Sequence, residues 1–228
     1  MLYLAGMGTS AVALAACGSS SGPTVAADAG AAGTAASADC VLTPEEIEGP
    51  FYTDLKLVRR DITDAKPGSP LEMRITVLDE TTCEPIPDAT VDVWHADATG
   101  LYSAFTGQGD NADVDTTAES FLRGVQPTDA NGTATFTTIY PGWYIGRTTH
   151  IHVKVHFANS TQVTTQLYLS DSTSDSVYAD HEAYTERGPK DTSNDADGFS
   201  ADLGSLRMTT TKAAAGHIAT HTIGIKRT

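Results

Sequence analysis

Two histidines placed two residues apart, His150 and His152, are the first candidates for chemistry in this sequence. The segment from Thr149 to Phe157 alternates between polar and apolar residues, which is the pattern of a β-strand with one face on a core. Alternation sends both histidines to one face and Ile151 and Val153 to the other. Neighbouring imidazoles can share one metal ion, and neutral imidazole suits zinc, copper, iron and nickel. The pair therefore predicts a metal site.

Two tyrosines and an arginine are placed to join the pair. Pro141-Gly142 predicts a turn that swings Tyr144 and Arg147 over the start of the histidine strand. A second stretch, Val91–Ser103, runs as a strand into a glycine-bearing turn and delivers Tyr102 beyond the strand end. The sequence thus brings phenol and guanidinium groups towards the imidazoles.

Less specific interpretations of the same residues stay open at this point. A His-x-His pair on a strand is often only a solvated polar face, and single tyrosines are common at the edge of a core. Arg147 could pair with one of the many acidic residues. We interpret the other histidines, among them His95, as surface or loop residues.

Taken together, the motifs resemble the intradiol ring-cleavage dioxygenase family, the ferric enzymes that open catechols between their two hydroxyls. The resemblance is greatest to the secreted, lipoprotein-like branch and runs from about Leu42 to Thr165. It rests on Trp-x-x-Asp-x-x-Gly-x-Tyr ending at Tyr102, Pro-Gly-x-Tyr ending at Tyr144, and Arg-x-x-His-x-His ending at His152. The combination is far more specific than any one of its parts.

The resemblance implies a role for each matching residue. Tyr102 and Tyr144 match the two tyrosinate ligands of the metal, and His150 and His152 match the imidazole pair. Tyr144 is the ligand that members of the family release when substrate binds, and Arg147 matches the arginine beside the bound ring. The spacer between Tyr144 and His150 is shorter here than in the catechol and protocatechuate enzymes, so the pocket rim is expected to differ.

The chemistry of these donors agrees with ferric iron. A phenol has a pKa near 10, so its oxygen binds a metal strongly only where a trivalent cation displaces the proton. Two tyrosinates with two neutral imidazoles suit Fe(III), a hard cation, better than zinc or Cu(I). The implied activity is a non-haem Fe(III)-dependent intradiol dioxygenase that uses O2 to open a catechol-type substrate between the hydroxylated carbons, giving a muconate-type diacid. Tyr144 and Arg147 are the candidate catalytic residues, and no organic cofactor is expected.

Two other classes of protein fit parts of the sequence. A non-catalytic β-sandwich, such as a transthyretin-like binding or adhesion module, would leave the four candidate ligands unexplained. A histidine-based copper or zinc binder would leave the tyrosines unexplained. The position of substituents on the catechol stays open, as does the oligomeric state, although the lack of a basic cluster disfavours the carboxylated substrate protocatechuate.

The pattern of the whole domain predicts an all-β fold, a β-sandwich of about seven to eight strands with long active-site loops. Loops are expected at residues 103–120 and 170–202, with a short helix around 177–184, and long ordered loops in a sandwich usually line a site. Alternating or β-branched segments predict strands at Leu71–Asp79, Ala89–His95, Thr133–Ile139, Thr149–Phe157, Val163–Leu169, Ser205–Thr211 and His217–Lys226.

Charge and length limit the possible partners. The chain has 228 residues, enough for one sizeable domain and an appendage. It carries 14 Lys and Arg against 29 Asp and Glu, a formal net charge of −15. Nucleic acids and anionic membrane surfaces are poor partners for such a chain.

The N-terminal residues are typical of an exported protein. Residues 1–16 form an uncharged apolar segment, too short to span a bilayer, that leads into Leu14-Ala-Ala-Cys17-Gly18 and resembles a lipobox whose cysteine is acylated. The basic region expected of a signal peptide is missing. Residues 17–39 have the composition of a flexible tether, and residues 40–228 form the predicted domain. We expect a protein exported to the extracellular or periplasmic face, either anchored in the membrane through Cys17 or secreted.

The remaining cysteines fit an oxidising compartment. If Cys17 is lipidated, Cys40 and Cys83 form an even pair, and a disulfide between them is expected. Two free, buried thiols are the alternative.

Overall fold

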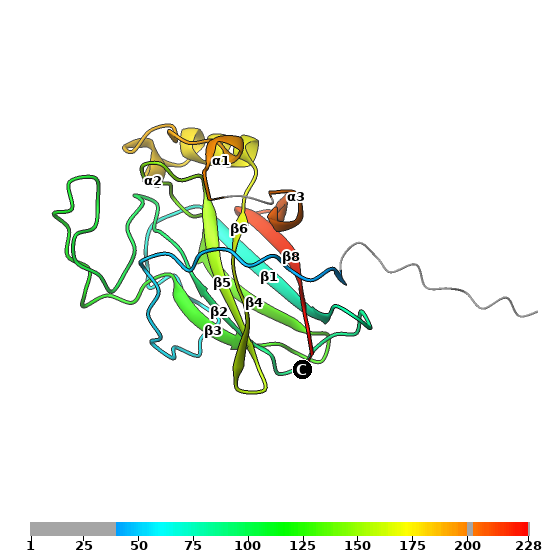
Figure 1. Cartoon of the computed structure of the whole chain (residues 1–228). Helices are drawn as coiled ribbons and strands as arrows, with labels where there is room; N and C mark the ends of the chain where they lie inside the picture. The colour runs from blue at the N-terminus through cyan, green and yellow to red at the C-terminus, as the bar shows by residue number, and fades with distance from the viewer. Residues whose placement is uncertain (1–39, 200–202, 228) are drawn as a thin grey trace, which may run out of the picture. The chain divides into compact units, whose positions relative to one another are not determined.

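The computed structural model of the protein describes residues 40–199 and 203–227 (Figure 1). The expected signal segment at residues 1–16 and the expected tether at 17–39, with its Cys17, lie outside the described residues. Within the described ranges, no helix has both the length and the apolar character needed to cross a bilayer.

Two four-stranded sheets face each other as a sandwich, which confirms the predicted all-β fold (Figure 1). The first sheet has the strand order β4-β1-β8-β7, and the second has the order β3-β2-β5-β6. Neighbouring strands pair antiparallel except β1 and β8, which are parallel. The strands are β1 Pro70–Asp79, β2 Thr90–Trp94, β3 Arg123–Pro127, β4 Thr133–Ile139, β5 His150–Phe157, β6 Ser160–Tyr168, β7 Thr209–Lys212 and β8 His217–Ile225.

The core lies between the sheets and follows the alternation of the strands. Successive side chains of a strand point to opposite faces, so every second residue of β1 and β5 is apolar and buried. These inward residues are Leu71, Met73, Ile75 and Val77 from the first sheet and Ile151, Val153 and Val155 from the second. The opposite face of β5 is thereby left to its polar residues.

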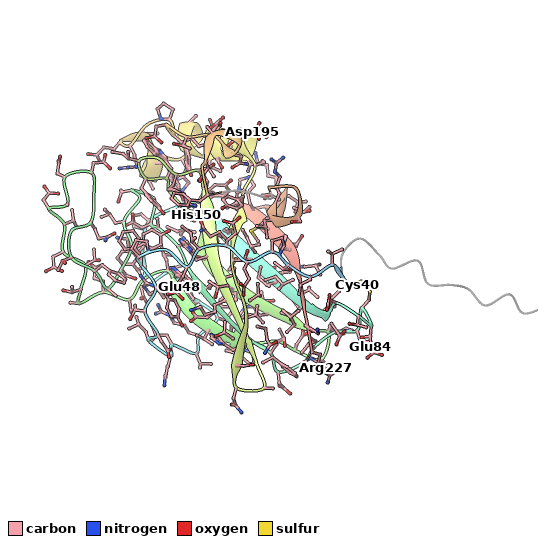
Figure 2. The ribbon with its side chains drawn as sticks, in the orientation of Figure 1. Cys40, Glu48, Glu84, His150, Asp195 and Arg227 are labelled. Atoms are coloured by element: carbon pink, nitrogen blue, oxygen red, sulfur yellow. A yellow bond between two sulfur atoms is a disulfide. The ribbon has the colours of Figure 1, made fainter. Side chains whose placement is uncertain are left out.

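That opposite face is covered, so the interpretation as a solvated face is wrong. His150 and His152 are only 3% and 1% exposed. The segment before β1, drawn in blue in Figure 1, crosses the outer face of the second sheet between Cys40 and Glu48, which are labelled in Figure 2. Its backbone is held by Gln166, whose Nε2 donates to the Ile47 carbonyl at 2.9 Å. The second sheet thus has a buried surface on both faces.

Short helices follow β6, most of them in the acidic segment at residues 170–202. They are α1 Asp171–Asp180, α2 Glu182–Thr185, a 3-10 helix at Asn194–Ala196 and α3 Leu203–Leu206. The predicted helix around residues 177–184 is present but begins earlier, because the Ser170 side chain accepts from the Thr173 backbone N–H and caps α1 there.

Two strand predictions differ from the structure. The segment predicted as a strand at Ser205–Thr211 begins in α3, and β7 starts only at Thr209. Strand β3 was not expected, because its sequence Arg-Gly-Val-Gln-Pro shows no alternation. It forms because β2 supplies a complete antiparallel register, from Thr90 opposite Pro127 to Trp94 opposite Arg123.

The predicted disulfide between Cys40 and Cys83 is confirmed, with the two Cα atoms 5.3 Å apart. Three residues on, the Thr43 backbone N–H donates to the Gly224 carbonyl at 2.9 Å. The disulfide and this hydrogen bond tie the start of the covering segment to the first sheet. The alternative of two free thiols is therefore wrong.

His95 was expected at the surface and is instead buried at 1% exposure. It follows Val91 and Val93 in the alternation of β2, and so points to the same inner side. Its Nδ1 donates to the Ala96 carbonyl at 2.8 Å, so Nε2 is the acceptor for the Thr138 hydroxyl at 2.7 Å. Burial lowers the pKa of His95 to about 4.

This depressed pKa predicts a pH-dependent stability. His95 is neutral in the folded protein and titrates near 6.5 when unfolded, so its contribution is complete above pH 6.5 and is lost as the pH falls towards 4. Each pKa unit corresponds to about 1.4 kcal/mol, so the shift of His95 sets an upper limit of about 3.5 kcal/mol. Urea unfolding of wild type and His95→Gln between pH 7 and 4 should show a shallower loss of stability in the variant. Parallel pH profiles would contradict it.

Candidate metal centre

The four side chains predicted as metal ligands meet at one point. His150 Nε2 lies 3.2 Å from His152 Nε2 and 3.2 Å from Tyr144 Oη. Tyr102 Oη lies 3.3 Å from His150 Nε2 and 3.1 Å from His152 Nε2. Four potential donor atoms thus face a common centre although they come from separate parts of the chain.

Strand β5 positions the imidazoles through its pairing on both sides. His152 lies opposite Trp94 of β2, and His150 lies opposite Tyr168 of β6. Trp94 stacks on the His152 ring, with centroids 4.9 Å apart and planes 6° apart. Because β5 is the inner neighbour of two strands, its outward side chains have little freedom to move.

Tyr102 reaches the centre from a turn after β2 that Asp97 holds. The Asp97 carboxylate accepts from the backbone N–H groups of Thr99 and Leu101 at 2.9 and 3.1 Å. Gly100 has a φ of +87°, and a Cβ there would lie 2.3 Å from the Trp143 carbonyl oxygen. The turn therefore needs glycine, both for its left-handed backbone and for close packing on the segment that carries Tyr144.

The segment before β1 closes the centre from outside. Phe51 stacks on Tyr102 with centroids 4.7 Å apart. A Cβ on Gly49, where φ is +75°, would approach His152 Cε1 to 3.2 Å. Tyr52 packs on Trp94 with ring centroids 4.8 Å apart. These contacts exclude water from the imidazoles on that side.

The imidazoles have the protonation state that metal binding requires. His150 Nδ1 donates to the Thr148 carbonyl at 2.7 Å, which leaves the lone pair of Nε2 facing the centre. Burial, followed by the charge of Arg147, lowers the pKa of His150 to about 3. Burial and then His150 hold the pKa of His152 well below its ordinary value. Both rings are therefore neutral across the physiological pH range.

The phenols differ in burial. Tyr102 is buried at 1% exposure, whereas Tyr144 is half-buried. Burial, with the nearby Tyr144 as a lesser cause, raises the pKa of Tyr102 well above its ordinary value. Burial likewise raises the pKa of Tyr144, against the opposing effect of Arg147. Only a strongly charged cation would displace these protons at neutral pH, which agrees with Fe(III) as the occupant.

Arg147 lies beside the exposed side of the centre. Its Nη1 donates to Tyr144 Oη at 3.3 Å, and its Nη2 donates to Gln166 Oε1. Its Nε forms an ion pair with Asp197 at 2.9 Å. An acidic partner for Arg147 was one of the open interpretations, and Asp197 is that partner. Gln166 was not predicted; the register of β5 and β6 places it opposite His152 and so on the same face.

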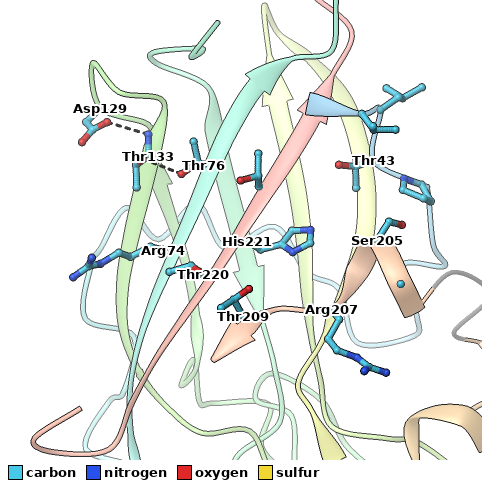
Figure 3. A pocket seen from close by; sticks show the side chains of 15 residues that line it. Thr43, Arg74, Thr76, Asp129, Thr133, Ser205, Arg207, Thr209, Thr220 and His221 are labelled. Atoms are coloured by element: carbon cyan, nitrogen blue, oxygen red, sulfur yellow. Dashed lines mark hydrogen bonds between the residues drawn. The ribbon is translucent and has the colours of Figure 1, made fainter. Parts of the chain in front are cut away.

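A cavity of about 320 Å³ adjoins Tyr144. Its wall is made by loop residues and by the segment before β1, namely Phe51, Gly100, Gly107, Gln108, Gly109, Asp110, Tyr144 and Ile145. The loop at residues 103–120 therefore lines the cavity beside Tyr144. A larger cavity of about 760 Å³ lies on the first sheet and is lined by Arg74, His221 and several threonines, with none of the predicted ligands (Figure 3).

Within the described part of the chain, the usual metal-binding side chains do not form a site by themselves. Among residues 40–199 and 203–227, no group of three or more His, Cys, Asp and Glu side chains could hold a metal ion. The arrangement therefore depends on the tyrosines. As ligands of a metal, Tyr102, Tyr144, His150 and His152 stay predictions, and the structure supplies the geometry that they need.

Comparisons with known proteins identify the family of this chain. The dioxygenase family model, Dioxygenase_C, matches residues 47–188. Catechol 1,2-dioxygenase 1 of Acinetobacter lwoffii is 29% identical over 168 residues, which cover 64% of this chain and 51% of the relative. Chlorocatechol 1,2-dioxygenase of Pseudomonas putida is 31% identical over 144 residues, covering 54% and 52%. The chain spans about half the length of the curated relatives that it matches.

Solved structures agree over most of the described domain. The intradiol ring-cleavage dioxygenase from Tetranychus urticae has a TM-score of 0.75 at 29% identity and covers 82% of this chain and 95% of its own. The dioxygenase domain of a dioxygenase carbohydrate-binding protein fusion from a Streptomyces species has a TM-score of 0.61 at 29% identity, covering 82% and 99%. The chain belongs to the intradiol ring-cleavage dioxygenase family.

Removing one phenol oxygen tests the ligand assignment. We expect Tyr102→Phe to weaken iron binding by about tenfold to a hundredfold or more. Losses of that size are typical even for residues that only hydrogen-bond to a metal ligand. Metal content after reconstitution with ferric iron measures it. Tyr184→Phe is the matched control, because Tyr184 is equally buried but donates to the Tyr140 carbonyl. Equal iron content in the Tyr102 variant and wild type would contradict the assignment.

Proposed function

We propose that the protein is a non-haem Fe(III)-dependent intradiol dioxygenase. It would use O2 to cleave a catechol-type diol between the two hydroxylated carbons and release a muconate-type diacid. The observation that carries the proposal is the convergence of two phenol oxygens and two neutral imidazoles beside a cavity of about 320 Å³. Family membership and the names of the relatives, catechol and chlorocatechol 1,2-dioxygenases, support it.

The donor set fits ferric iron, which Tyr102, Tyr144, His150 and His152 would hold. When bound, the ferric ion would draw electron density from a chelated catechol and make a ring carbon reactive towards O2. The neutral imidazoles contribute no charge, so the two phenolates offset most of the charge of the ion. Burial of Tyr102 favours its role as the permanent phenolate ligand.

Tyr144 is the ligand placed to exchange with substrate. It is half-buried and lines the cavity, whereas Tyr102 does not. Tyr144 would take a proton at Oη from an incoming catechol hydroxyl and turn away, which leaves room for both catechol oxygens. The raised pKa of Tyr144 favours the protonated, released form of the side chain.

Arg147 is placed to stabilise charge on the substrate. Its Nη1 lies 3.3 Å from Tyr144 Oη, which is the position that a catechol oxygen would enter. A preorganised cation at that position stabilises negative charge that develops on the ring oxygen during cleavage. Phe51 stacks on Tyr102 and forms part of the cavity wall, where its ring keeps water from the reacting atoms.

The product of catechol oxidation tests the proposal. Iron-loaded protein incubated with catechol under 18O2 should give cis,cis-muconate that carries both oxygen atoms of one O2 molecule, as measured by mass spectrometry. Arg147→Gln should lower kcat by about 10²–10³, the usual cost of removing a preorganised charge-stabilising donor. A ring-opened semialdehyde, or no uptake of O2 by protein that has bound iron, would contradict the proposal.

The cavity favours neutral catechols. Asp110 is on its wall, and the residues that line it include no lysine or arginine in the described part of the chain. Arg187 forms an ion pair with Asp110 at 2.8 Å. A carboxylate on the substrate would therefore face a carboxylate of like charge, which disfavours binding.

We expect kcat/KM for catechol to exceed that for protocatechuate at least several-fold in wild type. Asp110→Asn should reduce this ratio, because it removes the like charge and frees the Arg187 guanidinium. Steady-state kinetics with both substrates measure the ratio. Equal kcat/KM values in wild type would contradict the preference for neutral catechols.

Export is part of the proposal and rests on the sequence. The lipobox-like residues around Cys17 would anchor the protein in the membrane, and residues 17–39 would tether the domain at the extracellular or periplasmic face. The Cys40–Cys83 disulfide supports an oxidising compartment.

A further inference from the structure

Asp197 is a buried carboxylate that neither holds a predicted ligand nor faces the cavity. It follows the 3-10 helix Asn194–Ala196 and is 5% exposed. Its Oδ2 accepts from Arg147 Nε at 2.9 Å and from the Thr148 backbone N–H at 2.9 Å. Its Oδ1 accepts from the Phe199 backbone N–H at 2.9 Å, so the carboxylate is fixed on both sides.

The guanidinium of Arg147 is held by three different partners. Arg147 Nε donates to Asp197, Nη2 donates to Gln166, and Nη1 donates to Tyr144 Oη. The ring of Phe199 packs against the same guanidinium, with the Arg147 Cζ 4.8 Å from its centroid. A guanidinium has a planar, fixed fork of donors, so fixing Nε and Nη2 also fixes the direction of Nη1.

We propose that Asp197 is a positioning residue that aims Arg147 Nη1 at the atom where Tyr144 and substrate exchange, an inference that rests on the proposed function. It acts through Arg147 and does not touch the reacting atoms. Gln166 alone is not sufficient, because a neutral amide holds Nη2 through one hydrogen bond, whereas Asp197 holds the side chain through a buried ion pair.

Asp197→Asn tests the proposal because it keeps the shape and an oxygen acceptor and removes the charge. We expect kcat for catechol to fall about tenfold to a hundredfold, the cost of displacing a group near the reacting atoms by about 1 Å. KM and iron content should stay near the wild-type values. Asp195→Asn is the matched control, because Asp195, labelled in Figure 2, is exposed on the same 3-10 helix, and it should keep wild-type kcat.

A second variant separates a positioning role of Asp197 from a role in folding. Asp197→Glu retains the charge and moves the carboxylate by one methylene group, so it should give kcat between those of wild type and Asp197→Asn. A merely structural role would lower the thermal midpoint of these variants and leave kcat unchanged, and that result would overturn the proposal.

The positioning role can be judged even if wild type fails to cleave catechol, a result that would defeat the proposed function alone. A crystal structure of Asp197→Asn should then show Arg147 Nη1 displaced from Tyr144 Oη. Retention of that contact at its wild-type distance of 3.3 Å would overturn the positioning role by itself.

Discussion

The site depends on one constraint, the burial of two imidazoles on the outer face of a central strand. An exposed His-x-His pair would exchange protons with solvent near neutral pH. Here Trp94, Phe51 and the backbone at Gly49 form a second layer over β5, and burial keeps His150 and His152 neutral and fixed. The same layer raises the pKa of Tyr102, so that a strongly charged cation is the natural partner of the donor set.

The second layer is built from segments that are far apart in the sequence. The segment before β1 is tied at its start by Cys40–Cys83 and at the sheet by Gln166. The acidic segment after α2 returns to the opposite side through Asp197. Between them a cavity is lined by Tyr144 and not by Tyr102, which supports the proposed exchange of Tyr144.

The sequence predicts the strands best where alternation is strong. Strand β4 has the predicted bounds, and β5 begins within one residue of them, because their apolar residues face one core. Strand β3 lacks alternation and exists through its register with β2, which no local pattern encodes. His95 was assigned to the surface, although its alternation with Val91 and Val93 along β2 indicated the inner face.

The five predicted site residues lie close together as expected, since three contiguous motifs carry them. The role of Asp197 could not be predicted, because the loop contains many acidic residues. Only the folded structure shows which of them pairs with Arg147.

The visible absorption spectrum of the iron-reconstituted protein, before and after catechol is added without oxygen, tests the central claim most directly. Charge transfer from two tyrosinates to Fe(III) should give a red protein. Catechol that displaces Tyr144 should shift the band to longer wavelength, and Tyr102→Phe should remove most of the colour. A colourless wild-type protein that binds zinc, copper or no metal would contradict the claim.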